Sequence, residues 1–437
     1  MTASFLWLAA VTGALSLLTP CVFPMLPITV AYFKGNSDRS HAHALGHASL
    51  FASGIVITFT ALGLGLAILV GAAGLARFAA NPWVNLVIGF AFVGFAMSLL
   101  GLYDIPLPFG GRLLNTVDAS ARNRSGNAIG SVLAGFAFTL ASFTCTAPFV
   151  GPLLVSAARG DWMRPFAGMA VFSIVFATPF FLLALVPRWT TKLPRAGGWL
   201  RDVKVVVGLF EIAAAMKFFS NADLVWRTGI ISRRASLIVW ILVAAMSTIY
   251  LAVSMKRGTK SRSTSRSIGW MAAATAAAVT FWLASGLSGR SLGELEAFLP
   301  PAPVTAFAAT ANGNGGPVAL NWILNDHHAA LVQASATNRL VFIDFTGYTC
   351  TNCRWMEANM FSRPDVSAAM SHFVLSRLFT DGEGEVYENQ QKFQEDRFGT
   401  VALPLYAIVD GQGRTVRTFP GLTRNPAEFL SFLNNGS

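Results

Sequence analysis

Eight long apolar runs constrain the fold of this chain more than any other feature of its sequence. They lie at residues 3–33, 47–71, 82–103, 128–157, 164–186, 202–220, 236–255 and 268–288. A helix of ~20 apolar residues can cross a lipid bilayer, and 54% hydrophobic with 12% charged residues is far outside the range of soluble globular proteins. The sequence therefore predicts a polytopic α-helical membrane domain of eight helices. The first run has no basic leader and no obvious cleavage site, so we expect a retained helix rather than a signal peptide.

The rest of the chain has the composition of a soluble protein. Residues 289–325 contain a Pro-rich and a Gly/Asn-rich stretch, which is typical of a linker. We therefore predict three parts: a membrane domain at residues 1–288, a periplasmic linker at 289–325 and a soluble domain at 326–437.

Lysine and arginine are distributed unevenly between the predicted loops. The loops at 34–46, 104–127, 187–201 and 256–267 carry 14 of them, whereas those at 72–81, 158–163 and 221–235 carry 5. Because basic loops stay in the cytoplasm, both termini and the soluble domain are expected in the periplasm or its equivalent. The count of Lys and Arg minus Asp and Glu is +15 for residues 1–288 and −4 for residues 289–437. The positive charge of the membrane part thus indicates basic cytoplasmic loops. We exclude nucleic acid as a partner.

The membrane segments repeat internally. Each of the two membrane cysteines is followed by prolines at a similar spacing. The positions are Cys21, Pro24 and Pro27 in the first run and Cys145, Pro148 and Pro152 in the fourth. Gly89–Met97 in the third run likewise matches Gly208–Met216 in the sixth. Three helices per copy would invert the second copy, so we predict an inverted repeat of three plus three helices with two extra, in which the two cysteines meet at the pseudo-twofold axis.

The prolines beside the membrane cysteines are expected to break their helices. The set comprises Pro20, Pro24, Pro27, Pro148 and Pro152. A broken helix is tolerated in hydrocarbon only where it faces protein or a wet cavity. A water-reachable cavity would let each thiol meet partners from either side. The alternative is that both cysteines are small buried apolar residues.

A second cysteine pair, Cys350 and Cys353, follows an apolar run that ends at Thr346. The pattern predicts a strand, a short turn and a helix that begins at the first cysteine. A helix N-terminus lowers a thiol pKa, so Cys350 would be the nucleophile and Cys353 the resolving thiol. Half of a zinc site is the alternative, but this domain has no second cysteine pair, and we predict no bound metal.

Two further residues of the soluble domain have candidate roles. Asp344 interrupts the apolar strand, where burial would raise its pKa and let it accept a proton from the resolving thiol. Pro404 begins another strand-like run about fifty residues after the cysteine pair. This stretch resembles a thioredoxin fold, in which a cis-proline in that place would hold a substrate chain beside the active site.

Residues 340–437 resemble a thioredoxin domain, an α/β fold, and the segments Thr19–Pro24 and Thr144–Pro148 resemble the membrane domain of the DsbD family and its smaller CcdA relatives. The resemblance implies that Asp344 and Glu357 tune thiol pKa values and proton transfer. For Glu357 the alternative is a solvated helix face. DsbD proteins normally begin with a periplasmic immunoglobulin-like domain, whereas this sequence starts at a membrane run, so a separate protein is the expected final acceptor.

The resemblance implies a relay in a bacterial inner membrane. Cytoplasmic thioredoxin would reduce a Cys21–Cys145 disulfide, this dithiol would reduce Cys350–Cys353, and the soluble domain would reduce periplasmic thioredoxin-fold proteins or a disulfide isomerase, with cytochrome c maturation as one outcome. Thiol exchange needs no bound cofactor. NADPH would enter only upstream, through thioredoxin reductase.

Two other functions and two polar features stay open. A quinone-linked disulfide oxidase would run electrons the other way, but it would be expected to carry an additional cysteine pair. A small-solute or metal transporter would use the soluble domain for docking. Glu211 and Lys217 within the sixth run are either functional or a structural pair. The histidines His41, His43 and His47 are either metal ligands or part of a soluble loop.

Overall fold

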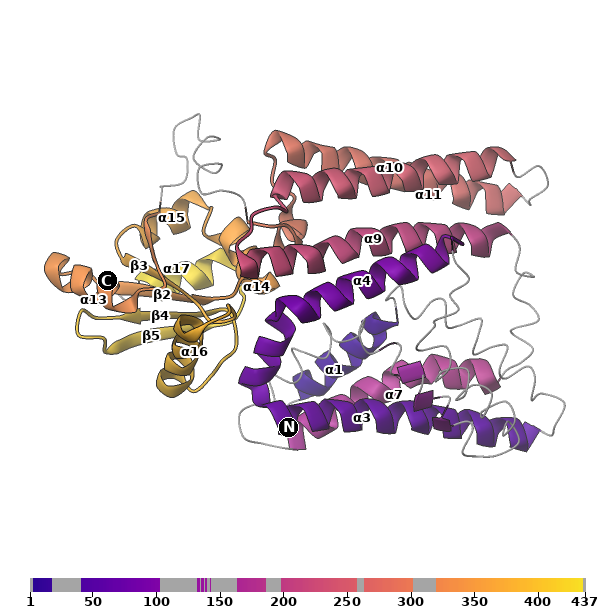
Figure 1. The fold of residues 1–437 in the computed structure, drawn as a ribbon, viewed down its shortest axis with the longest axis horizontal. Coiled ribbons are helices and arrows are strands. Elements are labelled where there is room, and N and C mark those ends of the chain that lie inside the picture. Colours follow the sequence, from indigo (N-terminus) through magenta and orange to yellow (C-terminus); the bar gives the residue numbers. More distant parts are fainter. Residues whose placement is uncertain are drawn as a thin grey trace. The chain divides into compact units, whose positions relative to one another are not determined.

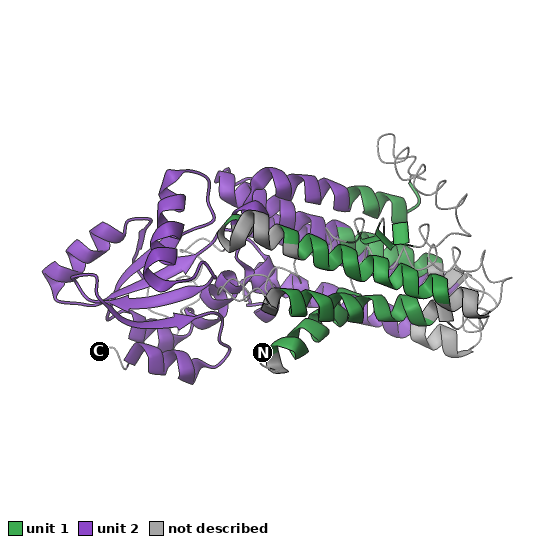
Figure 2. Cartoon of the chain, turned by 90° about the horizontal axis from the view of Figure 1, so that it is seen from below, with its two compact units in different colours: residues 1–75, 93–211 green, residues 76–92, 212–437 purple. Residues whose placement is uncertain are grey.

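A computed structural model describes residues 3–17, 41–102, 132–133, 135–136, 138–139, 142, 163–185, 198–257, 263–301 and 320–434. The chain divides into two compact units (Figure 2). The first comprises residues 1–75 and 93–211, and the second comprises residues 76–92 and 212–437.

The first unit is built from apolar helices that pack through phenylalanine rings. It contains α1 (Ala3–Ser16), most of α3 (His41–Ala80) and α7 (Met163–Leu185) (Figure 1). Phe59 packs edge-on against Phe172 and Phe176, with ring centroids 5.7 and 5.2 Å apart. Gly13 lets α1 approach α7 closely, since a Cβ atom there would lie 2.7 Å from the carbonyl oxygen of Phe172.

The second unit contains membrane helices as well as the C-terminal domain. Its helices are the beginning of α4 (Pro82–Leu99), the end of α9 (Gly198–Trp226), α10 (Arg233–Arg257) and α11 (Ser263–Ser285). Trp240 Nε1 donates a hydrogen bond to the carbonyl oxygen of Ala213 across 3.1 Å and joins α10 to α9. Ile249 and Phe281 are 63% and 82% exposed, as is usual for side chains that face lipid.

Four helices in the described part of the chain are long and apolar enough to cross a membrane. Their apolar windows are Gly46–Gly63, Pro82–Leu99, Arg233–Lys256 and Gly269–Ser288. The prediction of a membrane domain with several apolar helices is therefore confirmed. The number of eight helices and the inverted repeat stay predictions, because much of the predicted runs 3–33 and 128–157 lies outside the described residues.

The predicted loop at residues 72–81 is wrong for most of its length. Helix α3 continues to Ala80, and α4 begins at Pro82. The segment is rich in alanine, the best helix former, and contains no proline before Pro82. Asn81 then caps α4, since its side-chain oxygen accepts from the backbone N–H groups of Trp83 and Val84 at 2.9 and 3.2 Å.

The first part of the predicted linker is folded. Two short helical turns, η1 (Gly286–Ser288) and η2 (Gly293–Phe298), follow α11. Glu296 of η2 accepts from Arg233 of α10 across 2.6 Å. Ala297 lies in the core of the C-terminal domain, and Asn359 Nδ2 donates to the carbonyl oxygen of Gly293 across 3.2 Å. Residues 289–301 therefore connect α10 to the C-terminal domain by packing.

The C-terminal domain is a mixed sheet covered by helices, which confirms the α/β fold that the sequence predicted. The strands are β1 (Trp322–Leu324), β2 (Val341–Thr346), β3 (Val374–Phe379), β4 (Leu405–Val409) and β5 (Thr415–Pro420), in the order β1-β3-β2-β4-β5. The helices are α13 (His327–Thr337), α14 (Thr351–Trp355), the π-helical turn η3 (Met356–Met360), α15 (Pro364–Met370), α16 (Glu385–Phe398) and α17 (Pro426–Asn434). β3 runs parallel to β1 and β2, while β4 is antiparallel to β2 and β5.

The central strand β2 is buried on both faces, which explains its nearly unbroken apolar sequence. Phe342 belongs to one core cluster, with Tyr406 and Phe429. Ile343 and Phe345 point to the other face and belong to a second cluster. The alternation places Asp344 on the same face as Phe342, inside the domain.

Candidate active site

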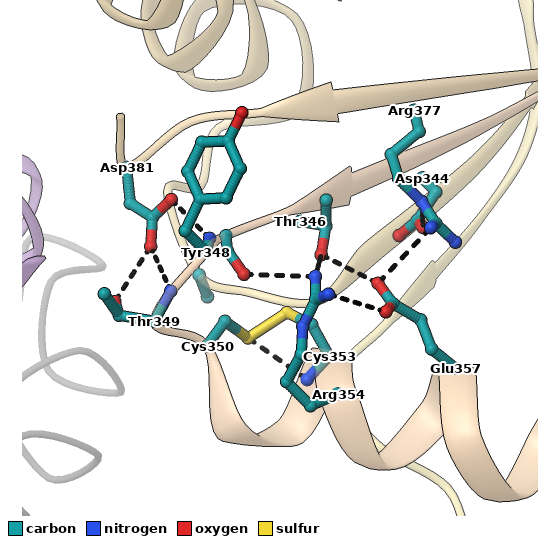
Figure 3. The surroundings of a disulfide bond; sticks show 12 residues. Asp344, Thr346, Tyr348, Thr349, Cys350, Cys353, Arg354, Glu357, Arg377 and Asp381 are labelled. Atoms are coloured by element: carbon teal, nitrogen blue, oxygen red, sulfur yellow. Dashed lines mark hydrogen bonds and ion pairs between the residues drawn. A yellow bond between two sulfur atoms is a disulfide. The ribbon is translucent and has the colours of Figure 1, made fainter. Parts of the chain in front are cut away.

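The two cysteines of the Cys-x-x-Cys motif form a disulfide where β2 leads into α14 (Figure 3). Cys350 caps the first turn of α14, and the backbone N–H of Cys353 donates to Cys350 Sγ across 3.1 Å. Cys353 is 1% exposed, whereas Cys350 is half-buried. A partner thiol therefore reaches Cys350 more easily, the order needed if Cys350 attacks and Cys353 resolves the mixed disulfide.

Asp381, just after β3, holds the turn before Cys350. Its carboxylate accepts from the backbone N–H of Tyr348 at 2.6 Å and from the N–H and hydroxyl of Thr349 at 2.9 and 2.8 Å. Burial raises the pKa of Asp381 above its ordinary value, although the hydrogen bonds from Thr349 and Tyr348 favour the ionised form. A Cβ atom at Gly347 would lie 2.6 Å from Asp381 Oδ2, so the turn requires glycine there.

Asp344 lies in β2 directly opposite Arg377 in β3. The side chain of Asp344 is 1% exposed, and Arg377 Nε donates to its Oδ2 across 2.8 Å. Desolvation raises the pKa of Asp344 to about 6 against the opposing charge of Arg377. The direction is the one that the sequence predicted, and a carboxyl group with this pKa can take up and release a proton during thiol exchange near neutral pH.

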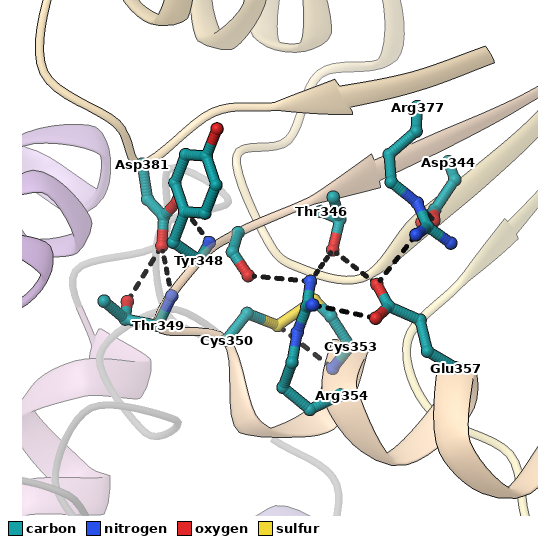
Figure 4. A network of polar contacts seen from close by, with 11 residues as sticks. Asp344, Thr346, Tyr348, Thr349, Cys350, Cys353, Arg354, Glu357, Arg377 and Asp381 are labelled. Atoms are coloured by element: carbon teal, nitrogen blue, oxygen red, sulfur yellow. Dashed lines mark hydrogen bonds and ion pairs between the residues drawn. A yellow bond between two sulfur atoms is a disulfide. The ribbon is translucent and has the colours of Figure 1, made fainter. Parts of the chain in front are cut away.

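Glu357 connects this ion pair to the turn at the disulfide. Its carboxylate lies 2.8 Å from Arg354 Nη1 and 3.7 Å from Arg377 Nη1, and its side chain is 15% exposed. Arg354 is also buried and donates to Thr346 Oγ1 at 3.3 Å. Figure 4 shows the alternating charges of Arg354, Glu357, Arg377 and Asp344 beside the disulfide. The alternative of a solvated helix face for Glu357 is therefore wrong.

Three residues of the site were missed by sequence reasoning: Arg354, Arg377 and Asp381. Each carries a signal, because Arg354 directly follows Cys353, Arg377 interrupts the apolar run of β3, and Asp381 follows that run. A charge inside a buried strand needs a partner. The sequence does not show which strands pair or in which register, so it cannot identify the partner of each charge.

Pro404 directly precedes β4, the neighbour of β2 in the sheet. The peptide bond between Leu403 and Pro404 is cis. The carbonyl oxygen of Pro404 accepts from the backbone N–H of Gly421 across 2.8 Å. Its role in holding a substrate chain stays a prediction.

The membrane part of the predicted site lies largely outside the described residues. This applies to Cys21, Cys145, Pro20, Pro24, Pro27, Pro148 and Pro152, and to the side chains of His41 and His43. His47 is buried within α3, so the interpretation of its surroundings as a soluble loop is wrong. Within the residues that the structure describes, no group of three or more His, Cys, Asp or Glu could hold a metal ion.

Comparison with known sequences identifies both parts of the chain. Residues 2–222, half of the chain, match the DsbD transmembrane family, described as "Cytochrome C biogenesis protein transmembrane domain". The chain belongs to the DsbD family. Residues 328–437 match the family described as "Thioredoxin-like domain". In this DsbD-family chain, α10 and α11 lie between the two matched segments.

Relatives named "Thiol:disulfide interchange protein DsbD" align with most of this DsbD-family chain. The proteins of Vibrio vulnificus (strain YJ016) and Vibrio cholerae are each 27% identical to it, over 91% of this chain and 61% of their own length. The protein of Pseudoalteromonas atlantica is 27% identical over 94% of this chain and 65% of its own length. The chain thus spans about three fifths of the length of these DsbD relatives.

Proposed function

We propose that this protein is a transmembrane protein-disulfide reductase that works by thiol-disulfide interchange. The observation that carries the proposal is the Cys350–Cys353 disulfide at the start of α14. The strand before it, β2, holds the buried carboxyl group of Asp344, whose pKa is about 6. It occurs in a chain whose relatives are named thiol:disulfide interchange proteins. Exchange between cysteine pairs needs no bound cofactor, so NADPH acts only indirectly, through thioredoxin reductase.

Electrons would enter from the cytoplasm and leave in the periplasm. Cytoplasmic thioredoxin reduces the Cys21–Cys145 disulfide, and the resulting dithiol reduces Cys350–Cys353. In this second step the membrane pair becomes a disulfide, the Cys350–Cys353 bond breaks, and two electrons and two protons move to the soluble domain. The acceptors would be periplasmic thioredoxin-fold proteins or a disulfide isomerase, and the reduced products could serve cytochrome c maturation.

The soluble domain would deliver the electrons through a mixed disulfide. The Cys350 thiolate attacks the acceptor disulfide and releases one acceptor thiolate. Cys353 then attacks Cys350 Sγ, closes the Cys350–Cys353 bond and frees the second acceptor thiolate. The hydrogen bond from the Cys353 N–H stabilises the Cys350 thiolate, and ionised Asp344 accepts the proton of Cys353. Glu357 and Pro404 are assigned to pKa tuning and to substrate positioning.

An inverted repeat would form the membrane domain at residues 1–288, and the packing between α4 and α9 supports it. A Cβ atom at Gly89 would lie 2.9 Å from the ring of Phe219, and one at Gly208 would lie 3.4 Å from Leu100. The offset that relates Gly89 to Gly208 also relates Leu100 to Phe219. The two contacts are therefore equivalent under the proposed repeat, as in carriers built from inverted halves. The membrane domain would have eight helices and be followed by a linker that starts at residue 289. The thioredoxin-like domain, predicted at 326–437, would begin earlier, because β1 (Trp322–Leu324) is part of its sheet.

The protein would lie in a bacterial inner membrane with both termini in the periplasm. Two arginines at helix ends that are poor in basic residues support this orientation. Arg77, near the end of α3, pairs with Glu388, and Arg227, just after α9, lies over the ring of Tyr348. These contacts support the prediction from the loop charges that both segments share one side of the membrane with the soluble domain.

The membrane cysteines provide the test. Cys21→Ala and Cys145→Ala are each expected to leave Cys350–Cys353 oxidised in cells, measured by acid-quenched thiol alkylation and gel mobility. Reduction of the same variants by dithiothreitol controls for folding of the soluble domain. A fully reduced Cys350–Cys353 pair in either variant would contradict the relay. The transporter alternative instead predicts that Cys21 can be replaced without loss of transport.

A further inference from the structure

Two arginines of the membrane helices contact the thioredoxin-like domain within the second unit. Arg77, near the end of α3, donates from Nε to Gln391 Oε1 across 2.5 Å, and its Nη1 lies 3.5 Å from Glu388 Oε1. Arg227, just after α9, places its guanidinium carbon 5.8 Å from the ring centroid of Tyr348 and 5.4 Å from that of Tyr387. Both distances are in the range of cation–π interactions.

The four residues that these arginines contact form one surface beside the disulfide. We call Tyr348, Tyr387, Glu388 and Gln391 the receiving face. Three of them come from one side of α16, at positions i, i+1 and i+4. Tyr348 precedes Cys350 by two residues, and its hydroxyl lies 3.3 Å from that of Tyr387. The receiving face therefore borders the reactive end of the domain.

Arg227 is presented by a turn of fixed shape. The backbone φ angle of Arg227 is 55°, a left-handed conformation that residues other than glycine rarely adopt. Asp223 in the last turn of α9 holds this turn, because its carboxylate accepts from the hydroxyl of Thr228 and from the backbone N–H groups of Ile230 and Ile231 at 3.0 and 3.1 Å. The arginine is thus held in place by contacts that do not involve the soluble domain.

The segments that carry Arg77 and Arg227 are joined to each other. Asn85 Nδ2 donates to the carbonyl oxygens of Ala79 and Asn81 at 2.8 and 2.9 Å, which fixes the connection between α3 and α4. Asn221 Nδ2 of α9 donates to Asn85 Oδ1 across 3.1 Å. Trp83 and Trp226 add an edge-to-face ring contact at 5.3 Å. The two arginines therefore occupy one frame.

The same frame contains a third cation on α9. Lys217 of α9 interacts electrostatically with Asp381, which holds the turn before Cys350, and with Arg354, which follows Cys353. Lys217 is therefore within electrostatic range of the residues on either side of the disulfide.

We propose that Arg77 and Arg227 are docking residues, through which the membrane domain holds the receiving face of its own thioredoxin-like domain while Cys350–Cys353 is reduced. The proposal rests on the proposed function and names the intramolecular partner of that site. An exposed ion pair and two cation–π contacts are individually weak, so the domain can also leave. Weak contacts suffice because η2 keeps the domain close, at a high effective concentration.

Charge reversal tests the docking contact in the full chain. In Arg77→Glu/Arg227→Glu we expect the ratio of reduced to oxidised Cys350–Cys353 in cells to fall about tenfold, the size that the lost contacts can supply. Arg234→Glu is the matched control, since Arg234 is an exposed arginine in the first turn of α10, seven residues after Arg227, and it should leave the ratio unchanged. Adding Glu388→Arg to Arg77→Glu should restore part of the loss caused by Arg77→Glu alone. An unchanged ratio in the double variant overturns the proposal.

A second readout does not depend on electron flow. A photoreactive benzoylphenylalanine in place of Val386, a 53% exposed neighbour of Tyr387 on α16, should cross-link to peptides from the end of α3 or from the loop after α9. The Arg77→Glu/Arg227→Glu variant should lose the cross-link, and Arg234→Glu should keep it. A cross-link retained by the double variant overturns docking even if the relay is intact. The two proposals can also fail separately. If the cross-link depends on the arginines but Cys21→Ala leaves the redox state of Cys350–Cys353 unaltered, docking is supported and the relay is rejected.

Discussion

The charged side chains beside the disulfide form a balanced set of buried charges. Two carboxylates alternate with two guanidinium groups, and Asp344 is the most buried of them. Removing one member would leave another charge unpaired in a buried site, which is costly. Arg377 has a further contact, since its guanidinium carbon lies 4.0 Å from the ring centroid of Trp322. The network therefore fixes Asp344 and Glu357 while keeping a proton acceptor near the thiols.

Asp344→Asn is expected to slow the reduction of a protein disulfide by the prereduced full-length protein by about 10-fold to 100-fold, because an amide cannot accept the proton of Cys353. The pKa of Asp344 is about 6. Below that pH the carboxyl group is protonated, so the wild-type rate should fall as the pH drops through about 6. The variant should lose this inflection between pH 5 and 8.

Asp396→Asn, which changes an exposed carboxylate on α16, is the control and should keep the wild-type profile. If Asp344→Asn retains both the rate and the inflection, Asp344 is not the proton acceptor.

Helices and strands differ in how well the sequence predicted them. The strand before the cysteine pair and the start of α14 follow directly from an apolar run and a turn, which are local signals. The end of α3 was misplaced, because alanine-rich segments continue a helix whether or not lipid surrounds them. The pairing of Asp344 with Arg377 could not be predicted, since it depends on the register between two strands.

The close packing of α4 on α9 gives a prediction for these elements. Gly89→Ala should lower the stability of the detergent-solubilised protein by about 1–3 kcal/mol, because the added Cβ atom would lie 2.9 Å from the ring of Phe219. Gly208→Ala should have a smaller effect, since its Cβ atom would lie 3.1 Å from Leu99 Cβ. Thermal unfolding followed by circular dichroism gives the comparison.

Gly94→Ala in the same helix is the matched control, because nothing lies within 4 Å of the position of its Cβ atom. Alanine is a better helix former than glycine, so this variant should be as stable as the wild type or up to ~1 kcal/mol more stable. Equal melting temperatures for Gly89→Ala and Gly94→Ala would contradict the close approach of α4 and α9.

The whole molecule combines a membrane domain of the DsbD family with a thioredoxin-like domain. The sequence predicted both parts, because hydropathy and a Cys-x-x-Cys motif are properties of short segments. It did not predict that residues 289–301 pack between α10 and the soluble domain, because a Pro-rich segment has the same composition whether it is packed or extended. The proposed relay needs a soluble domain that stays near the membrane, which this packing provides. It also needs contacts weak enough to release the domain, as those of Arg77 and Arg227 are.

Dependence on cytoplasmic thioredoxin tests the direction of electron flow most directly. The measurement is acid-quenched thiol alkylation of the protein in cells with and without thioredoxin, with the Cys21/Cys145 and Cys350/Cys353 pairs resolved on gels. The relay predicts that both pairs become oxidised when thioredoxin is absent. If both pairs keep their state without thioredoxin and instead follow respiration or quinone supply, electrons run the other way and the protein is a disulfide oxidase.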